Sequence, residues 1–344
     1  MLFCRARIIL VFFWKWHPIT VKFGFMGQPP TIPDALTGSS PVSIHRKLLF
    51  NLALFALTGG LIAITLKVCF RAGWDTSPMA LGFYRMLVIG IVYLLLAVNR
   101  QDRLLPASVR ARAYLLAATV LKAIVNALLL YGLLIMDAAV FQILFSCLYP
   151  AFSLMITRYA NRLSDRLTAG RVSGCLLGAG AAVMIGLKDG FDFSTNIGLW
   201  GFCIAGLACL VAGIHLNLER KAIEHGATPM QSMLGVSLYT APLFLVFAVV
   251  AGEPLAAPLA SGSGLSALLF CVLIGVLHYA ARRYCQGISQ VSGFLLIELL
   301  VVFVTVVTAV LFLGEILTWP AVVGLACLPV ALWIGRARLK VETP

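Results

Sequence analysis

Long apolar runs, separated by short polar segments, constrain the fold of this chain more than any other feature. An α-helix rises 1.5 Å per residue, so about twenty residues cross the roughly 30 Å hydrocarbon core of a bilayer. Runs of that order occupy residues 49–70, 77–98, 113–134, 138–158, 167–187, 198–217, 229–251, 264–281, 290–313 and 317–336. They are too continuously apolar for the alternating strands of a membrane barrel. We predict an all-α membrane protein with about ten transmembrane helices.

The composition excludes an ordinary soluble domain. Of the 344 residues, 61% are hydrophobic and only 11% are charged, whereas soluble domains have about 25% charged residues. The formal net charge of +13 would suggest nucleic-acid binding in a soluble protein. Here the basic residues lie mostly in short segments between apolar runs, where they set the orientation in the membrane. We therefore expect the lipid bilayer as a partner, and no nucleic acid.

The charges of these short segments also predict the topology. If the N-terminus is cytoplasmic, the outer loops carry only two basic residues, Arg71 and Lys188, while the inner segments carry many. This loop-by-loop alternation follows the positive-inside rule and would be scrambled by an error of one helix. We predict that both termini are cytoplasmic. Residues 1–48 and 337–344 would then be cytoplasmic tails, and one hypothesis is that the chain starts at Met26, with residues 1–25 an artefact.

An internal repeat divides the apolar region. The Asp-Arg-Leu-Thr segment at 165–168 and the Glu-Ile-Leu-Thr segment at 315–318 lie 150 residues apart, and residues 77–79 and 228–230 match at an offset of 151. Two near-equal offsets indicate duplication. Each copy, 49–187 and 198–336, holds five predicted helices, so the second must be inverted. Inverted repeats are typical of secondary transporters; the alternative is a duplicated membrane protein that transports nothing.

At these residues the sequence resembles the drug/metabolite transporter superfamily, in particular its ten-helix EamA type. The resemblance covers roughly residues 49–336 and rests on Gly314-Glu315-Ile316-Leu317-Thr318 with Gly324, Ser164-Asp165-Arg166-Leu167-Thr168 with Gly174, Tyr149-Pro150, Phe83-Tyr84-Arg85-Met86 and Lys67. The first half departs from the pattern, with Asp165 for the usual Glu and Ser164 for the usual Gly. The resemblance implies an inner-membrane protein that exports or exchanges small metabolites, often amino acids, along an ion or metabolite gradient.

Four charged residues interrupt the predicted spans: Lys67, Arg85, Lys122 and Glu298. A charge at the centre of a membrane helix costs about 2.5–3.5 kcal/mol on insertion scales, so it faces a cavity or a partner. Lys122 and Glu298 lie near mid-depth, and we expect both to bind an amino-acid-like substrate or to couple its transport. The alternative is a mutual ion pair that fixes packing. Lys67 is expected to reach the interface, and Arg85 is equally compatible with a structural role.

Polar side chains within the spans complete the predicted site. The candidate substrate-binding or coupling residues are Glu298, Lys122, Tyr149, Asn126, Gln142 and His278. The resemblance suggests that this site lies near the bilayer midplane, between the third, fourth, eighth and ninth predicted helices. For each neutral residue the alternative is an ordinary hydrogen bond between helices.

Absent motifs narrow the functional classes. The chain has no phosphate-binding glycine loop, no His-Glu-x-x-His, no Gly-x-Ser-x-Gly and no Cys/His cluster with zinc spacing. We therefore expect no catalytic residue, no metal and no cofactor. The leading interpretation is a secondary transporter, an exporter of small amino-acid-like compounds. A structural or assembly membrane protein and an intramembrane enzyme are the alternatives, and the sequence leaves a homodimer open.

Overall fold

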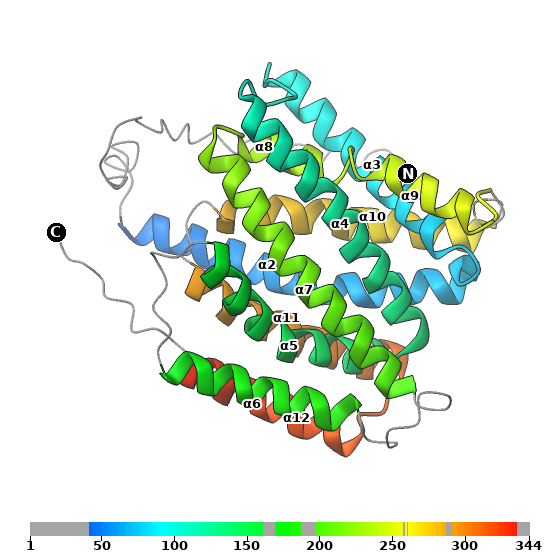
Figure 1. Ribbon diagram of the computed structural model, residues 1–344. Coiled ribbons are helices and arrows are strands. Elements are labelled where there is room, and N and C mark those ends of the chain that lie inside the picture. The colour runs from blue at the N-terminus through cyan, green and yellow to red at the C-terminus, as the bar shows by residue number, and fades with distance from the viewer. Residues whose placement is uncertain are drawn as a thin grey trace. The chain divides into compact units, whose positions relative to one another are not determined.

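The computed structural model describes residues 41–160, 169–186, 197–256, 259, 261–286 and 291–335, and within them it is helical, with no strand. The chain falls into two compact units, Met1–Phe50 and Asn51–Pro344. The helices, shown in Figure 1, are α2 (Pro41–Cys69), α3 (Pro78–Asn99), α4 (Val109–Ile135), α5 (Ala138–Ala160), α6 (Ala169–Gly186), α7 (Ile197–Glu224), α8 (Pro229–Val236), α9 (Ala241–Val250), α10 (Gly262–Gln286), α11 (Val291–Thr308) and α12 (Trp319–Gly335). Short π-helical segments, η2 (Phe70–Trp74) and η4 (Ala309–Leu313), extend α2 and α11.

Six of the described helical segments are long and apolar enough to cross a membrane. They are Phe50–Trp74, Pro78–Asn99, Val109–Ile135, Leu199–Glu224, Pro229–Val250 and Gly262–Arg282. Four shorter apolar helices accompany them, at Ala138–Tyr149, Val172–Met184, Leu300–Leu313 and Trp319–Val330. Large apolar side chains such as Leu176, Phe303 and Val250 are exposed on helix surfaces, as expected where lipid replaces water. The predicted all-α membrane class is therefore confirmed, whereas ten spans remain a prediction.

The helix ends agree with the apolar runs within a few residues, except at three places. Helix α2 begins at Pro41, eight residues before the predicted run 49–70 and within the segment 1–48 predicted as a tail. The predicted run 198–217 continues as helix to Glu224, and the predicted run 264–281 continues to Gln286. Glu219 and Arg282, which lie just beyond these predicted runs, are therefore helical and buried. A run predicted from hydropathy stops at its first charged residues. The helix itself continues there, because the charged side chains form an ion pair with each other.

The predicted helix 229–251 is broken in the middle, between α8 and α9. Pro242 lies in the first turn of α9, where its missing N–H and its ring prevent a continuous helix across this point. The turn packs closely on α3, because a Cβ added to Gly90 would lie 2.6 Å from the Cα of Leu238. The break therefore fits against a glycine on a neighbouring helix.

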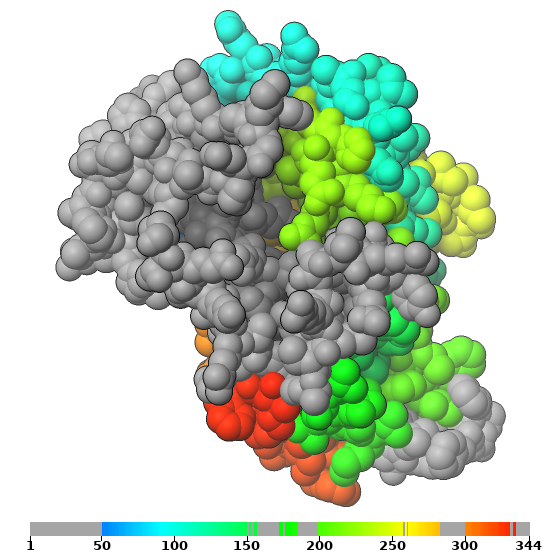
Figure 2. Space-filling view, turned by 60° about the vertical axis from the view of Figure 1, so that its left-hand side comes forward, coloured from blue at the N-terminus to red at the C-terminus, as the bar shows by residue number. Residues whose placement is uncertain are grey.

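Helices distant in sequence form the bundle of the second unit. Among helices that do not follow each other in the chain, the most extensive contacts join α4 with α7, α6 with α12, α5 with α7, and α3 with α9. Figure 1 shows α4 and α7 running side by side, and Figure 2 shows α6 (green) beside α12 (red). The contact of α2 with α11 is also close, since a Cβ on Gly60 would lie 2.6 Å from Val304 Cγ1. Thr305 on α11 donates its hydroxyl to the Gly60 carbonyl at 3.1 Å.

Two glutamates fix the beginnings of helices that lie elsewhere in the sequence. The carboxylate of Glu315 accepts hydrogen bonds from the backbone N–H groups of Ala138 and Ala139, at 2.8 and 2.9 Å. Glu253 does the same for Met79 and Ala80, at 3.2 and 2.9 Å. The first N–H groups of a helix have no partner within the helix, and a carboxylate there also complements the helix dipole. Glu315 therefore anchors α5, and Glu253 anchors α3.

Candidate substrate cavity

A cavity of about 190 Å³ lies inside the second unit, among seven helices. Its walls come from α2, α3, α4, α5, α7, α10 and α11. The polar and charged lining residues are Arg85, Lys122, Asn126, Gln142, Tyr149, His215, His278, Tyr279 and Arg282. The remaining lining is aliphatic or aromatic apart from Gly59. Small-molecule sites are typically apolar cavities with a few placed polar groups.

Five of the six predicted site residues line this one cavity: Lys122, Asn126, Gln142, Tyr149 and His278. The backbone of Glu298, the sixth, belongs to α11, and its side chain lies outside the described residues. The four helices expected around the site correspond to α4, α5, α10 and α11, and each contributes to the lining. The structure thus brings the described candidates together, and their role in binding stays a prediction.

One face of α4 forms a wall that changes character along its length. Lys122, Asn126, Leu129, Leu130 and Leu133 all line the cavity. Their spacing of three to four residues places them on one side of the helix. Eleven residues separate the first from the last, which corresponds to about 16 Å of helix. The wall therefore begins with an amine, continues with an amide and ends with three leucines.

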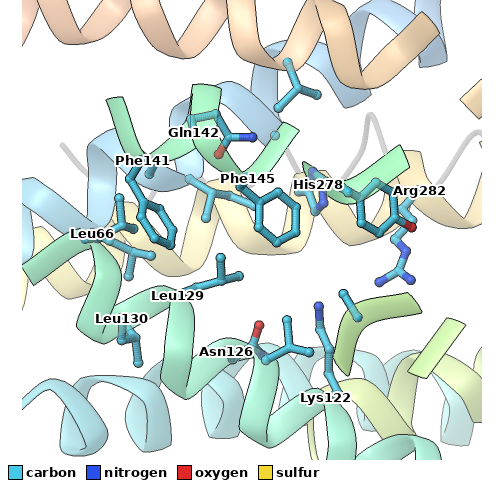
Figure 3. A pocket seen from close by; sticks show the side chains of 18 of the residues that line it. Leu66, Lys122, Asn126, Leu129, Leu130, Phe141, Gln142, Phe145, His278 and Arg282 are labelled. Carbon is cyan, nitrogen blue, oxygen red and sulfur yellow. The ribbon is translucent and has the colours of Figure 1, made fainter. Parts of the chain in front are cut away.

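Three cations line the cavity, and two of them, Lys122 and Arg282, lie at one end (Figure 3). In Figure 3 the side chains of Lys122 and Arg282 reach from opposite sides toward the same space, near His278. Arg85 on α3 lines the cavity as well. No carboxylate is among the described side chains that line the cavity.

A buried ion pair behind this end was missed by sequence reasoning. Arg282 Nη2 donates to Glu219 Oε2 at 3.0 Å, and both side chains are almost inaccessible. The hydroxyl of Ser232 donates to the other carboxylate oxygen of Glu219, and His215 Nε2 lies 3.6 Å from Oε2. His215 Nδ1 lies 2.9 Å from the carbonyl oxygen of Ala118 on α4. The pair therefore joins α7 to α10, with α4 and α8 attached to it.

The sequence does contain a sign of this ion pair, but a prediction from hydropathy alone does not use it. His215 and Glu219 are four residues apart, so they share one face of a helix if the helix extends past residue 217. The following positively charged segment suggested a loop instead. A histidine deep in an apolar run needs a polar partner. Glu219, four residues after His215, could have been identified as that partner from the sequence.

Four buried polar atoms of residues that line the cavity have no hydrogen-bond partner in the structure: Arg85 Nε, Asn126 Nδ2, His215 Nε2 and His278 Nδ1. Arg85 and Asn126 are 6% and 7% exposed, and neither Arg85 Nε nor Asn126 Nδ2 has a hydrogen-bond partner. Buried polar atoms are rarely left unsatisfied in proteins, and each exception needs an explanation. Both side chains line the cavity, so a molecule in the cavity could satisfy them.

The opposite end of the cavity is apolar. Figure 3 places Leu66, Leu129, Leu130 and Phe141 together, away from Lys122 and Arg282. Phe145 lies between the two ends and stacks on Tyr149, with ring centroids 5.6 Å apart. The cavity therefore offers cations at one end and hydrocarbon at the other.

Other charged or polar residues of the predicted spans have different surroundings. Lys67 is half-buried and is not among the residues that line the cavity. Tyr131 is partly exposed, and Tyr239 donates its hydroxyl to the carbonyl of Leu104 at 3.1 Å. Within the described part of the chain, no three His, Cys, Asp or Glu side chains are grouped so that they could hold a metal ion.

Comparisons with known proteins place the fold but not the activity. No protein-family model matches the chain. No curated protein matches it. Among solved structures 26 chains match, and one of them, described only as the crystal structure of a protein, has a TM-score of 0.56 and 16% sequence identity. That match covers 82% of this chain and 97% of the other. At such low identity the likeness concerns the fold alone.

Proposed function

We propose that this chain is a secondary transporter that moves a small molecule across the membrane by alternating access. The observation that carries the proposal is the cavity of about 190 Å³, which lies among apolar helices and holds polar and charged side chains. Charged groups in a membrane protein are expensive and commonly mark a substrate or ion pathway. A bundle with a purely structural role has no need to keep three cations around a cavity.

We propose ten spans in two inverted halves, and hydrogen bonds at helix ends support this. The N–H of Asp102 donates to the Ala97 carbonyl, and the N–H of Glu253 donates to the Ala248 carbonyl, both at 2.9 Å and 151 residues apart. Gln101 and Gly252, also 151 apart, both have a left-handed backbone, with φ of 56° and 67°. The end of α3 is thus built like the end of α9.

The beginnings of the matching helices agree as well. Leu81 N donates to the Ser77 carbonyl and Ser232 N to the Thr228 carbonyl, both at 3.0 Å and again 151 residues apart. The broken pair α8 and α9 thus corresponds to α3, which gives each copy five helical segments. An odd number of spans inverts the second copy. The cavity walls then come from both halves, α2 to α5 from one and α7, α10 and α11 from the other.

The family, the direction and the location are part of the same proposal. The motifs around Glu315 and Asp165 favour an EamA-type member of the drug/metabolite transporter superfamily, acting as an exporter of amino-acid-like or related compounds. The loop charges favour an inner-membrane protein with both termini cytoplasmic. The substrate would bind where Lys122, Asn126 and Gln142 line the cavity, with Glu298 contributing from α11.

The test compares metabolites in cells and medium for four strains: wild type, Lys122→Met, Glu298→Gln and Arg112→Gln. Arg112 is an exposed cation outside the cavity and serves as the matched control. We expect at least one compound to accumulate in the medium with the wild type and the control, and several-fold less with the two cavity variants. Equal export by all four strains at equal protein levels would contradict the assigned site.

An unchanged metabolite profile with and without the chain, across several growth media, would contradict transport itself. The structural or assembly interpretation would then gain support. Conversion of a compound without its movement would support the intramembrane-enzyme interpretation.

A further inference from the structure

We propose that the cavity selects a small organic anion, a monocarboxylate with an apolar body, over the zwitterion or the cation of the same shape. This inference rests on the proposed function and narrows its substrate class from amino-acid-like or related compounds to the related carboxylic acids. It is argued from the charges that line the cavity, from the unsatisfied donors of Arg85 and Asn126, and from the separation of charged and apolar ends.

The charge balance favours an anion. Arg85, Lys122 and Arg282 line the cavity, and Glu219 pairs with Arg282 at 3.0 Å from behind the lining. If Glu298 were paired with Lys122, one of the three cations would still have no carboxylate partner. That cation is Arg85. A buried charge without a partner is costly, so an anionic ligand is favoured there and a cationic one disfavoured.

Arg85 has the geometry for a carboxylate. Its side chain is buried, its Nε has no hydrogen-bond partner, and no described carboxylate forms an ion pair with it. A guanidinium group donates two parallel hydrogen bonds to a carboxylate. The Nδ2 of Asn126, also buried and without a partner, is a second unused donor in the same lining. Arg85 Nε and Asn126 Nδ2 are both donors, and a carboxylate is purely an acceptor.

The apolar end and the volume limit the rest of the ligand. Leu66, Leu130 and Phe141 provide hydrocarbon contacts on the side away from Lys122 and Arg282 (Figure 3). A cavity of about 150 Å³ holds benzene, with its six non-hydrogen atoms, so one of about 190 Å³ holds about eight non-hydrogen atoms. This size and polarity fit a branched or aromatic carboxylic acid better than a sugar or a phosphate ester.

Four probes of one shape, each with about nine non-hydrogen atoms, separate the charge types. They are 4-methyl-2-oxopentanoate (anion), leucine (zwitterion), leucinamide (cation) and 4-methyl-2-oxopentanamide (neutral). Binding is measured by isothermal titration calorimetry on the purified full chain in lipid nanodiscs, with empty nanodiscs as the blank. We expect the anion to bind at least about tenfold more tightly than each of the others, because hydrogen bonds to charged groups are the strongest available.

Variants test where the anion binds. Arg85→Gln is expected to weaken binding of the anion by about 10- to 100-fold, Arg85→Lys by less, and Arg112→Gln not at all. Should Arg85→Gln fail to fold, the four-probe comparison on the wild type decides alone. Tighter binding of leucine, leucinamide or the neutral amide, binding of inorganic phosphate alone, or binding of none of these probes would overturn the inference.

A flux measurement distinguishes failure of this inference from failure of the proposed transport function. Counterflow of labelled 4-methyl-2-oxopentanoate and labelled leucine is measured in proteoliposomes. Counterflow of the oxo acid above that of leucine supports both proposals. Flux of leucine alone overturns the anion selectivity and leaves the transporter intact, whereas binding of the oxo acid without flux of either probe contradicts transport and keeps the site.

Discussion

Replacement of Glu315 by Gln is expected to destabilise the protein through the beginning of α5. The carboxylate of Glu315 is 8% exposed and accepts two backbone hydrogen bonds, from Ala138 at 2.8 Å and Ala139 at 2.9 Å. Glutamine keeps one acceptor oxygen and puts an NH₂ donor against the other N–H. One charge-assisted hydrogen bond, worth about 1.5–3 kcal/mol, is lost, and the interaction of the negative charge with the helix dipole, worth about 0.3–1 kcal/mol, disappears.

The expected loss of unfolding free energy is therefore about 2–4 kcal/mol. The measurement is reversible denaturant unfolding of the purified protein in micelles, followed by circular dichroism. Glu224→Gln is the matched control, because Glu224 is exposed and its ion pair with Arg220 is long, at 3.8 Å; it should change stability by less than about 0.5 kcal/mol. Glu253→Gln, which removes a similar anchor from α3, should resemble Glu315→Gln. If Glu315→Gln unfolded with the stability of the control, the helix-anchoring argument would be refuted.

Two further substitutions test packing and the buried ion pair by the same unfolding measurement. Glu219→Gln leaves the charge of Arg282 buried without its partner, so we expect a loss of about 3–5 kcal/mol; a loss below that of Glu224→Gln would contradict a buried pair. Gly60→Ala forces a Cβ into atoms of α11, with an expected loss of about 1–3 kcal/mol. Its control is Gly180→Ala, an exposed helical position with open space around it, which should be neutral or slightly stabilising. Equal effects at the two glycines would contradict the close approach of α2 and α11.

The helices could be predicted because each is long and apolar, and the bilayer imposes a length on such a run. The cavity residues were predictable for a related reason. A polar side chain such as Asn126 or Gln142 in an apolar helix needs a partner or a cavity, and all five described candidates line the same one. In a membrane protein the rare polar residue therefore carries more information than it does in a soluble domain.

Residues at the ends of apolar runs could not be assigned in the same way. Glu219 and Arg282 fall outside the predicted runs 198–217 and 264–281 because each stands next to other charged residues. Their pairing joins helices that are 63 positions apart in sequence, which local patterns do not reveal. Glu315 was noted through its motif, but its contact with the beginning of α5 lies 177 positions away and could not be foreseen. Hydropathy identifies elements, whereas contacts between them depend on the fold.

The described carboxylates and cations of this bundle have different tasks. Glu219 pairs with Arg282, while Glu253 and Glu315 anchor two helices, so these three acids are engaged in holding the structure. The cations Arg85 and Lys122 instead reach the cavity. If these three acids provide the framework and Arg85 and Lys122 face the cavity, the cavity attracts anions. At equal protein level, Glu315→Gln should then leave the transport of such an anion unchanged, whereas Arg85→Gln should reduce it.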